Sequence, residues 1–186
     1  MSFGGPGEST VERDAMAYAL SKGVFLAAAA GNAGDTGNEP TFPAASASEF
    51  EGLVAVGALD YNFNRAPYSN SNPYVEIAAP GGNLEVDADG DGYPDGILQE
   101  TLDLDLVSQG IFNQFGYFFL QGTSMAAPHV SGLAALLVKQ GVKSPKAVEA
   151  IIEATATDVG PAGRDNDTGF GVINPRAAIF GMGLAK

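Results

Sequence analysis

The sequence is poor in several residue types. Its 186 residues include no cysteine, nine lysines and arginines, and one histidine. Without cysteine there is no disulfide framework and no thiolate metal site. Phosphate binding requires lysine and arginine, so the small number of these residues argues against a nucleic-acid partner. No apolar run approaches the roughly 20 residues of a membrane span, and the first residues lack the pattern of a secretory signal. We therefore expect neither a nucleic-acid nor a membrane partner.

Acidic and apolar residues are abundant instead. The formal net charge is -13, 45% of the residues are hydrophobic, and 25 are glycine. This composition is typical of one globular domain with a packed, loop-rich core, and its charge favours cation binding. No internal repeat or low-complexity tract interrupts it.

Apolar runs alternate with helical segments along the chain. Ser9 and Glu12 form a capping-box pattern at the start of a predicted helix, and Gly23 is a typical residue to end it. The buried-strand lengths of the apolar runs, bounded by Gly, Pro and Asn, predict strands. We expect helices at 10–22, 124–140 and 144–154, a short one from Asn174, and strands at 24–30, 53–59, 75–81 and 115–120. This order predicts an α/β protein.

A polar, acidic segment at 82–110 breaks this order, so we interpret it as an insertion. Its core, "DADGDGYPDG", has aspartates at alternating positions with Gly92 at the turn, which resembles the first nine positions of an EF-hand calcium loop. The predicted calcium ligands are Asp87, Asp89, Asp91, the carbonyl of Tyr93, and Asp95.

The twelfth position of this loop is Leu98 in place of the usual bidentate glutamate. Glu100 or Asp103 would have to complete the coordination shell. A solvated acidic turn without an ion is the alternative.

Ser124 follows a glycine at the start of a predicted helix and is a candidate nucleophile. A serine hydroxyl needs a general base within hydrogen-bond reach. The only histidine is His129, and five helical residues turn the chain by roughly 500°, which leaves the two side chains about 140° apart. His129 is therefore a poor base, and we expect it to be packed in the core. Either Ser124 is not a nucleophile or its base lies outside these residues.

The stretch "GTSMAAPHVSGLAALL", with "AAAAGNAG", "FPAAS" and "VAVGALD" upstream and "GFGVINPRAA" downstream, resembles the carboxyl-terminal half of the catalytic domain of subtilisin-like serine proteases. The resemblance covers nearly the whole chain outside the insertion. It implies a three-layer α/β fold with a mainly parallel central sheet, of which residues 1–186 are the C-terminal part, and hydrolysis of peptide or protein substrates.

The resemblance also implies roles for two residues. Ser124 would be the acylating nucleophile, with its own backbone N–H helping to bind the oxyanion at the helix N-terminus. Asn32 would supply the second oxyanion donor through its side-chain amide. The alternative is a helix cap at Ser124 and a simple strand-ending turn at Asn32.

Substrate-binding residues follow from the same resemblance. An extended substrate would lie along the first residues, and small side chains near the end of the strand at 24–30 would line the adjoining pocket. The implied residues are Ser2, Phe3, Gly4, Ala29, Ala30 and Gly31. A glycine-rich turn and an ordinary buried strand are the alternative.

The sequence departs from the family in one respect. The family places the aspartate and histidine of its triad upstream of everything seen here, and neither is present. The "DTG" at Asp35 is no substitute, because it follows Asn32 by three residues in an expected loop. We therefore expect these residues to be a fragment with little or no peptidase activity alone. Its expected partner, besides the substrate, is the missing N-terminal half of the catalytic domain. Export to the extracellular space or periplasm is implied by resemblance only.

Three functions remain open at this point. The first is a serine endopeptidase that acts through an acyl-enzyme on Ser124. The second is a non-catalytic, calcium-stabilised, degenerate protease domain that binds extended peptides. The third, a dinucleotide-binding fold from "GNAGDTG", is disfavoured because its glycines miss the GxGxxG spacing.

Overall fold

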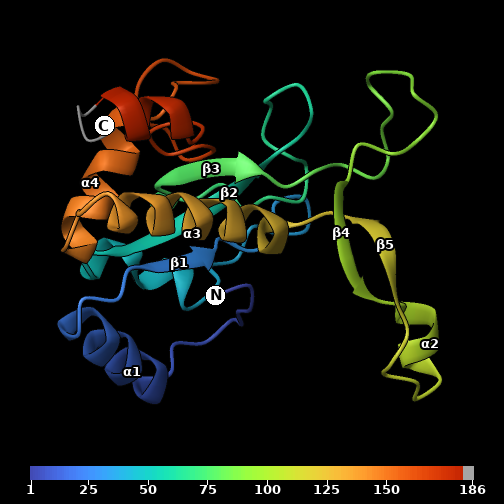
Figure 1. The fold of residues 1–186 in the computed structure, drawn as a ribbon, viewed down its shortest axis with the longest axis horizontal. Coiled ribbons are helices and arrows are strands. Elements are labelled where there is room, and N and C mark those ends of the chain that lie inside the picture. The colour runs from blue at the N-terminus through green and yellow to red at the C-terminus, as the bar shows by residue number, and fades with distance from the viewer. Residues whose placement is uncertain (182–186) are drawn as a thin grey trace.

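The computed structural model describes residues 1–181 and has an α/β fold (Figure 1). A parallel sheet of three strands forms its centre in the order β1 (Leu26–Ala29), β2 (Leu53–Leu59) and β3 (Ile77–Pro80). The three strands predicted for this region are confirmed, with β1 and β3 shorter than their apolar runs. No helix within residues 1–181 is long and apolar enough to cross a membrane.

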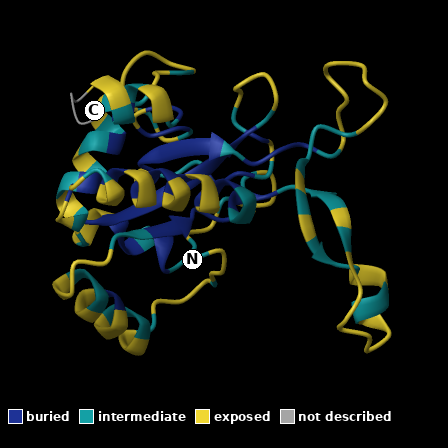
Figure 2. Ribbon diagram, in the orientation of Figure 1, coloured by how far each residue is buried: buried dark blue, intermediate teal, exposed yellow. Residues whose placement is uncertain are grey.

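Helices cover both faces of the sheet. On one face α3 (Thr123–Lys139) and α4 (Pro145–Thr155) pack against alternate strand residues such as Val54 and Val56. On the other, α1 (Thr10–Ser21) and a 3-10 helix at Ala44–Glu49 pack against the intervening residues such as Ala55. Every residue of β2 is therefore buried, as Figure 2 shows, which explains its unbroken apolar sequence.

The predicted helix starts are confirmed by their caps. Ser9 Oγ accepts a hydrogen bond from the Glu12 N–H at 3.4 Å, and Ser144 Oγ accepts one from the Ala147 N–H at 3.0 Å. At the C-terminal end, Asn174 Oδ1 accepts from the Ala177 N–H at 2.9 Å and begins a π-helical turn at Ala177–Gly181. These contacts join residues three apart, so the sequence alone could specify them.

Replacing Ser144 by alanine is expected to lower the free energy of unfolding by about 1 kcal/mol, because the Ala147 N–H loses its acceptor. Urea denaturation measures this. Ser144→Asp is the matched control, since aspartate also caps a helix, and it should restore the stability of the parent. Equal losses in both variants would contradict the capping role.

The insertion differs from its prediction. The strand at 115–120 exists as β5 (Phe115–Leu120), but it does not return to the central sheet. It pairs antiparallel with β4 (Ile97–Leu102), and the short α2 (Leu104–Ser108) joins the two. This hairpin arm projects from the sheet in Figure 1. No residue of β5 is buried, so it could not replace a strand that is buried on both faces.

Candidate active site

Ser124 is the second residue of α3, at the carboxyl edge of the sheet. The residue before the helix, Gly122, has φ of 144°, which favours glycine. The first backbone N–H groups of a helix have no partner within it and, together with the helix dipole, attract negative charge. The Thr123 N–H donates to Asn32 Oδ1. The Met125 and Ala126 N–H groups donate to the Gly122 carbonyl. Among residues 1–181 no acceptor is bonded to the Ser124 N–H, which is therefore available beside the partly exposed hydroxyl.

Asn32 lies next to the start of α3. Its Oδ1 accepts two hydrogen bonds from Thr123, one from the backbone N–H at 2.9 Å and one from Oγ1 at 2.8 Å. This fixes the orientation of the side chain and leaves Nδ2 on its other side. A Cβ at Gly122 would lie 3.4 Å from Nδ2, an ordinary van der Waals contact, so the positive φ and not lack of space favours glycine there. Asn32 is exposed, and among residues 1–181 no acceptor is hydrogen-bonded to its amide N–H groups, so they can face a ligand.

Thr123 is a positioning residue that the sequence analysis missed. It is 1% exposed. While its Oγ1 donates to Asn32, the same oxygen accepts from the Gly31 N–H at 3.2 Å. One threonine therefore ties the loop after β1 to the first turn of α3 and holds Asn32 beside Ser124. In the sequence, only its position between Gly122 and Ser124 could have indicated this role.

Two hydrogen bonds join Ser2 and Ser124, and each residue donates one of them. Ser2 Oγ donates to the Ser124 carbonyl at 2.8 Å, and Ser124 Oγ donates to the Ser2 carbonyl at 3.4 Å. Pro128, four residues after Ser124, has no N–H for that carbonyl, so the Ser2 hydroxyl takes its place. Met1 positions Ser2, because the Met1 carbonyl accepts a hydrogen bond at 3.0 Å from the N–H of Ala29, the last residue of β1.

A pocket of about 750 Å³ lies elsewhere, but one of about 370 Å³ opens beside Ser124. Four of the six predicted substrate-binding residues line this smaller pocket: Phe3, Gly4, Ala29 and Gly31. Glu39 and Thr41, which the sequence analysis did not select, line it as well.

Ala30 does not line the pocket. It is fully buried and packs in the cluster around Met16 on the opposite face of the sheet. Successive residues of a strand point to opposite faces, so Ala29 and Ala30 cannot both face the pocket.

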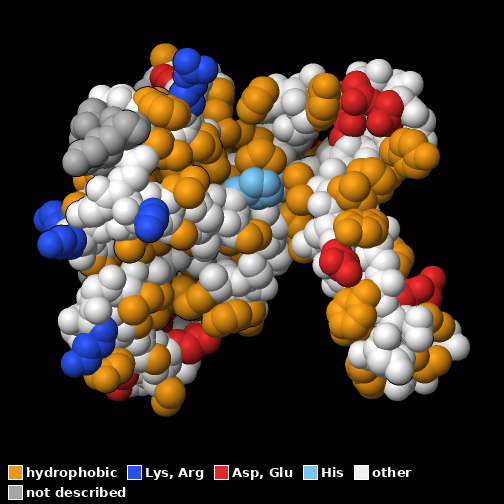
Figure 3. Space-filling view, viewed as in Figure 1, with side chains coloured by type: hydrophobic (Ala, Val, Ile, Leu, Met, Phe, Trp, Pro, Cys, Tyr) orange, Lys and Arg blue, Asp and Glu red, His pale blue; other side chains and the backbone are white. Residues whose placement is uncertain are grey.

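His129 is exposed, so the prediction of a packed core histidine is wrong. Its Nδ1 lies 2.8 Å from the Met125 carbonyl, one turn back along α3, and Figure 3 shows the ring on the surface. Among residues 1–181 no imidazole is hydrogen-bonded to Ser124. Asp35 lies exposed in a turn, as its loop position predicts.

The acidic loop brings three of the predicted calcium ligands together. Carboxylate oxygens of Asp87, Asp89 and Asp91 lie within 4.8 Å of one another. Asp95 lies outside this group, and its Oδ2 accepts from the Ala88 N–H at 2.7 Å. The three grouped aspartates also accept hydrogen bonds from backbone N–H groups of the loop. Three converging carboxylates suit a hard cation such as Ca²⁺.

Two other residues named for the calcium loop make contacts with the arm. Asp103 caps α2 by accepting from the Asp105 and Leu106 N–H groups. The Tyr93 ring stands 6.0 Å from the Phe119 ring. The loop therefore packs on the arm at Tyr93.

An α/β fold with a serine at a helix N-terminus, an asparagine amide beside it and an adjoining pocket is typical of serine hydrolases with an oxyanion hole. The chain belongs to the subtilase family, which matches residues 1–171.

Individual relatives agree with this membership. The chain is 35% identical to subtilisin DY of Bacillus licheniformis over 96% of its own length and 55% of that protein. It is 33% identical to fervidolysin of Fervidobacterium pennivorans, over 97% of this chain and 25% of the relative. A solved protease of Pseudoalteromonas arctica PAMC 21717 superposes with a TM-score of 0.78 at 32% identity, covering 96% of this chain and 49% of the other. The chain spans about half or less of the length of these three proteins.

Proposed function

We propose that these residues form the serine-bearing part of a serine endopeptidase that hydrolyses peptide bonds in peptides and proteins. The observation that supports this most strongly is the arrangement of Asn32, Thr123 and Ser124, which leaves amide N–H groups free beside a helix-terminal serine. Family membership supports the reaction class.

In the proposed mechanism Ser124 Oγ attacks the substrate carbonyl carbon while a base takes its proton. The negative charge on the carbonyl oxygen is stabilised by the Ser124 N–H and the Asn32 amide. The amine then leaves with a proton, and water hydrolyses the acyl-enzyme. The pocket beside Ser124 would receive one substrate side chain.

We place the general base and its aspartate outside these 186 residues. The hydroxyl of Ser124 donates to the Ser2 carbonyl, and His129 is bonded to the carbonyl of Met125. The alternative function is a non-catalytic domain that binds extended peptides, and the same hydrogen bond of Ser124 favours it.

A fluorophosphonate that labels activated serines separates these two functions. We expect no labelling of this chain alone. We expect labelling of Ser124 in a longer protein that also contains the residues encoded immediately upstream. Mass spectrometry identifies the site, and Ser124→Ala is the control. Absence of labelling in the joined protein would favour the peptide-binding domain.

We also propose that the acidic loop binds calcium through Asp87, Asp89 and Asp91, with the Tyr93 carbonyl and Asp95 completing the shell after a local rearrangement. The convergence of three carboxylates supports this. Export of the whole protein to the extracellular space or periplasm is proposed from its resemblance to the subtilisins alone.

Saturating calcium is expected to raise the melting temperature by about 5–10 °C, because an ion that binds only the folded state stabilises it by mass action. The double variant Asp89→Ala, Asp91→Ala should lose this shift. Asp14→Ala, which removes an exposed charge from α1, should keep it. An unchanged melting temperature of the parent on adding calcium would exclude the site.

A further inference from the structure

A second and larger hollow lies at the same edge of the sheet as Ser124. It has a volume of about 750 Å³ and lies between the loop at 60–63, which follows β2, and the acidic loop at 87–96 with the base of the arm. In Figure 1 these two loops rise side by side from the carboxyl ends of β2 and β3. We refer to this hollow as the arm groove.

The lining of the arm groove combines carboxylates with aromatic rings. Its carboxylates are Asp60, Asp89, Asp91 and Asp95, and no lysine or arginine lines it. Arg65, on the same loop as Asp60, is held in an ion pair with Asp167 at 3.1 Å. A bound divalent cation would still leave the lining negative. The groove is therefore suited to a cationic ligand.

Three aromatic side chains of the arm groove face solvent. Tyr61 and Phe63 are each 55% exposed, and Tyr93 is 61% exposed. Exposed aromatic rings near carboxylates attract ammonium and guanidinium groups through cation–π contacts and bury their aliphatic stems. Lysine and arginine side chains match both features.

Phe63 has a backbone conformation that disfavours any side chain. Its φ is 62°, and only Asn38 shares a positive φ among the non-glycine residues described. A bulky residue costs about 1 kcal/mol there relative to glycine. Because its ring is largely exposed, packing in the core does not offset this cost. The positive φ belongs to the turn between Leu59 and Arg65, in which the Phe63 N–H donates to the Asp60 carbonyl at 3.2 Å, and glycine can adopt the same conformation.

The arm groove is close to Ser124. It begins at the ends of β2 and β3, whereas the smaller pocket begins at the end of β1. Neighbouring strands lie about 4.8 Å apart, so an extended peptide crosses from β1 to β3 in about three residues. Tyr68 Oη connects the two regions by accepting from the Gly122 N–H and donating to the Gly82 carbonyl.

We propose that the arm groove binds a lysine- or arginine-rich segment of the polypeptide substrate whose neighbouring residues lie at Ser124. The groove would thereby direct the enzyme to basic protein segments. This inference rests on the proposed function for its choice of occupant, but peptide binding tests it without any catalysis.

The test uses fluorescein-labelled 12-residue peptides that share an apolar centre and carry three Lys, three Ser or three Glu at each end. Fluorescence anisotropy measures their Kd for the chain at low and physiological salt, with and without calcium. We expect the Lys peptide to bind at least about tenfold more tightly than the Ser peptide, and the Glu peptide to bind most weakly. The preference should fall as salt rises.

Phe63→Gly is the decisive variant. It should reduce the Lys-peptide preference at least about fivefold while the melting temperature stays equal to or above that of the parent, because glycine relieves the strain. Tyr18→Ala removes an exposed ring from α1 and should leave the preference unchanged.

Three results would overturn the proposal. The first two are equal affinity for the three peptides and no binding of the Lys peptide at about 1 mM. A Lys preference that survives Phe63→Gly would move the basic site elsewhere, for example to Glu39, and would also overturn it. Ser124→Ala should keep peptide binding, so a failure of the catalytic proposal is distinguished from a failure of this one.

Discussion

Replacing Asn32 by aspartate is expected to lower kcat by about 10²–10³, or more, in the catalytic domain that contains this chain and a complete triad. Aspartate has nearly the same shape and keeps an oxygen for the two hydrogen bonds that Thr123 donates. It replaces the amide N–H groups by a second oxygen, which cannot donate and adds negative charge. The variant therefore removes oxyanion stabilisation while preserving the local structure.

Steady-state kinetics with a chromogenic peptide measures this effect. An interaction made only in the transition state changes kcat, so KM should change little. A kcat within about threefold of the parent would exclude Asn32 as an oxyanion donor.

Thr123→Val provides the matched test of positioning. Valine removes the hydroxyl that joins Gly31 to Asn32 but leaves the backbone N–H of residue 123 as a donor to Asn32. We expect a smaller loss of about tenfold in kcat, because Asn32 is held by one hydrogen bond instead of two. A loss as large as that of Asn32→Asp would mean that Thr123 acts by more than orientation.

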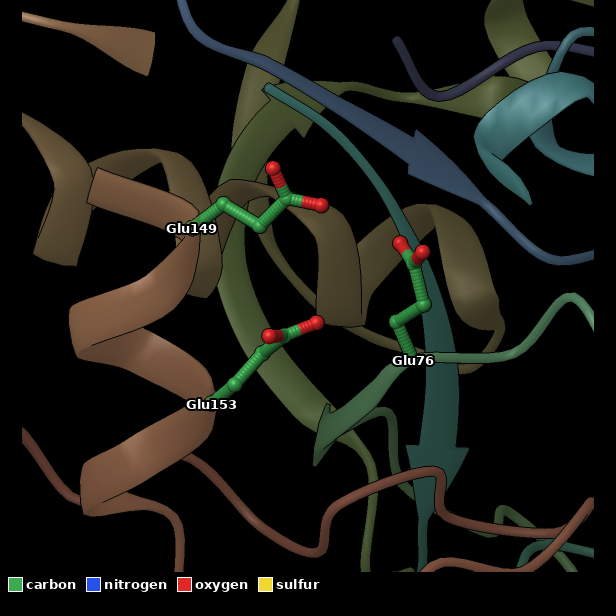
Figure 4. Close-up of side chains that lie close together, drawn as sticks. All are labelled: Glu76, Glu149 and Glu153. Carbon is green, nitrogen blue, oxygen red and sulfur yellow. The ribbon is translucent and has the colours of Figure 1, made fainter. Parts of the chain in front are cut away.

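Replacing Glu76 by glutamine is expected to raise the free energy of unfolding at pH 8 by on the order of 3 kcal/mol. Glu76 is 8% exposed and faces Glu149 and Glu153 of α4, as Figure 4 shows. Burial is the main cause that raises the pKa of Glu76 to about 8, and the two neighbouring carboxylates add to it. The Ala55 N–H and Arg164 act in the opposite direction.

The sign of the pH dependence follows from these pKa values. Unfolded Glu76 loses its proton near its ordinary pKa of 4.5, whereas folded Glu76 keeps it until about pH 8. Between these values the folded state binds more protons, so the stability of the protein falls as pH rises. Burial also raises the pKa of Glu149 and Glu153, which acts with the same sign.

Urea denaturation of both proteins from pH 4 to pH 9 measures the effect. The two stabilities should be nearly equal at pH 4 and diverge as pH rises. Glutamine can still accept the hydrogen bond from the Ala55 N–H, so that contact is retained. Glu51→Gln, which removes an exposed carboxylate paired with Lys146, should change stability by less than about 0.5 kcal/mol. Parallel curves for Glu76→Gln and the parent would contradict the raised pKa.

The sequence-based expectations were accurate where the interacting residues are close together in the sequence. The capping serines Ser9 and Ser144 bond residues three positions away, and both helices begin where predicted. The strand at 115–120 was predicted from its aromatic, apolar run, but its partner β4 was not predicted. An apolar run indicates a strand and does not specify which strand pairs with it.

The placement of two single residues shows the same limit. Local spacing excluded His129 as the base of Ser124, yet nothing local indicated that its ring would be exposed rather than buried. The family resemblance placed Ala29 and Ala30 together in the pocket, although successive residues of an extended chain point to opposite faces of the sheet.

The sequence by itself determined the family, the α/β class, the helix starts and the position of Ser124, because these depend on motifs and on contacts within a few residues. Tertiary structure alone decided that Thr123 orients Asn32, from which it is 91 residues distant in sequence. It also decided that Glu76 meets the two glutamates of α4 and that the arm forms a groove with the loop after β2. These arrangements depend on how the helices and strands pack, and no local pattern encodes the distance between residues that only packing brings together.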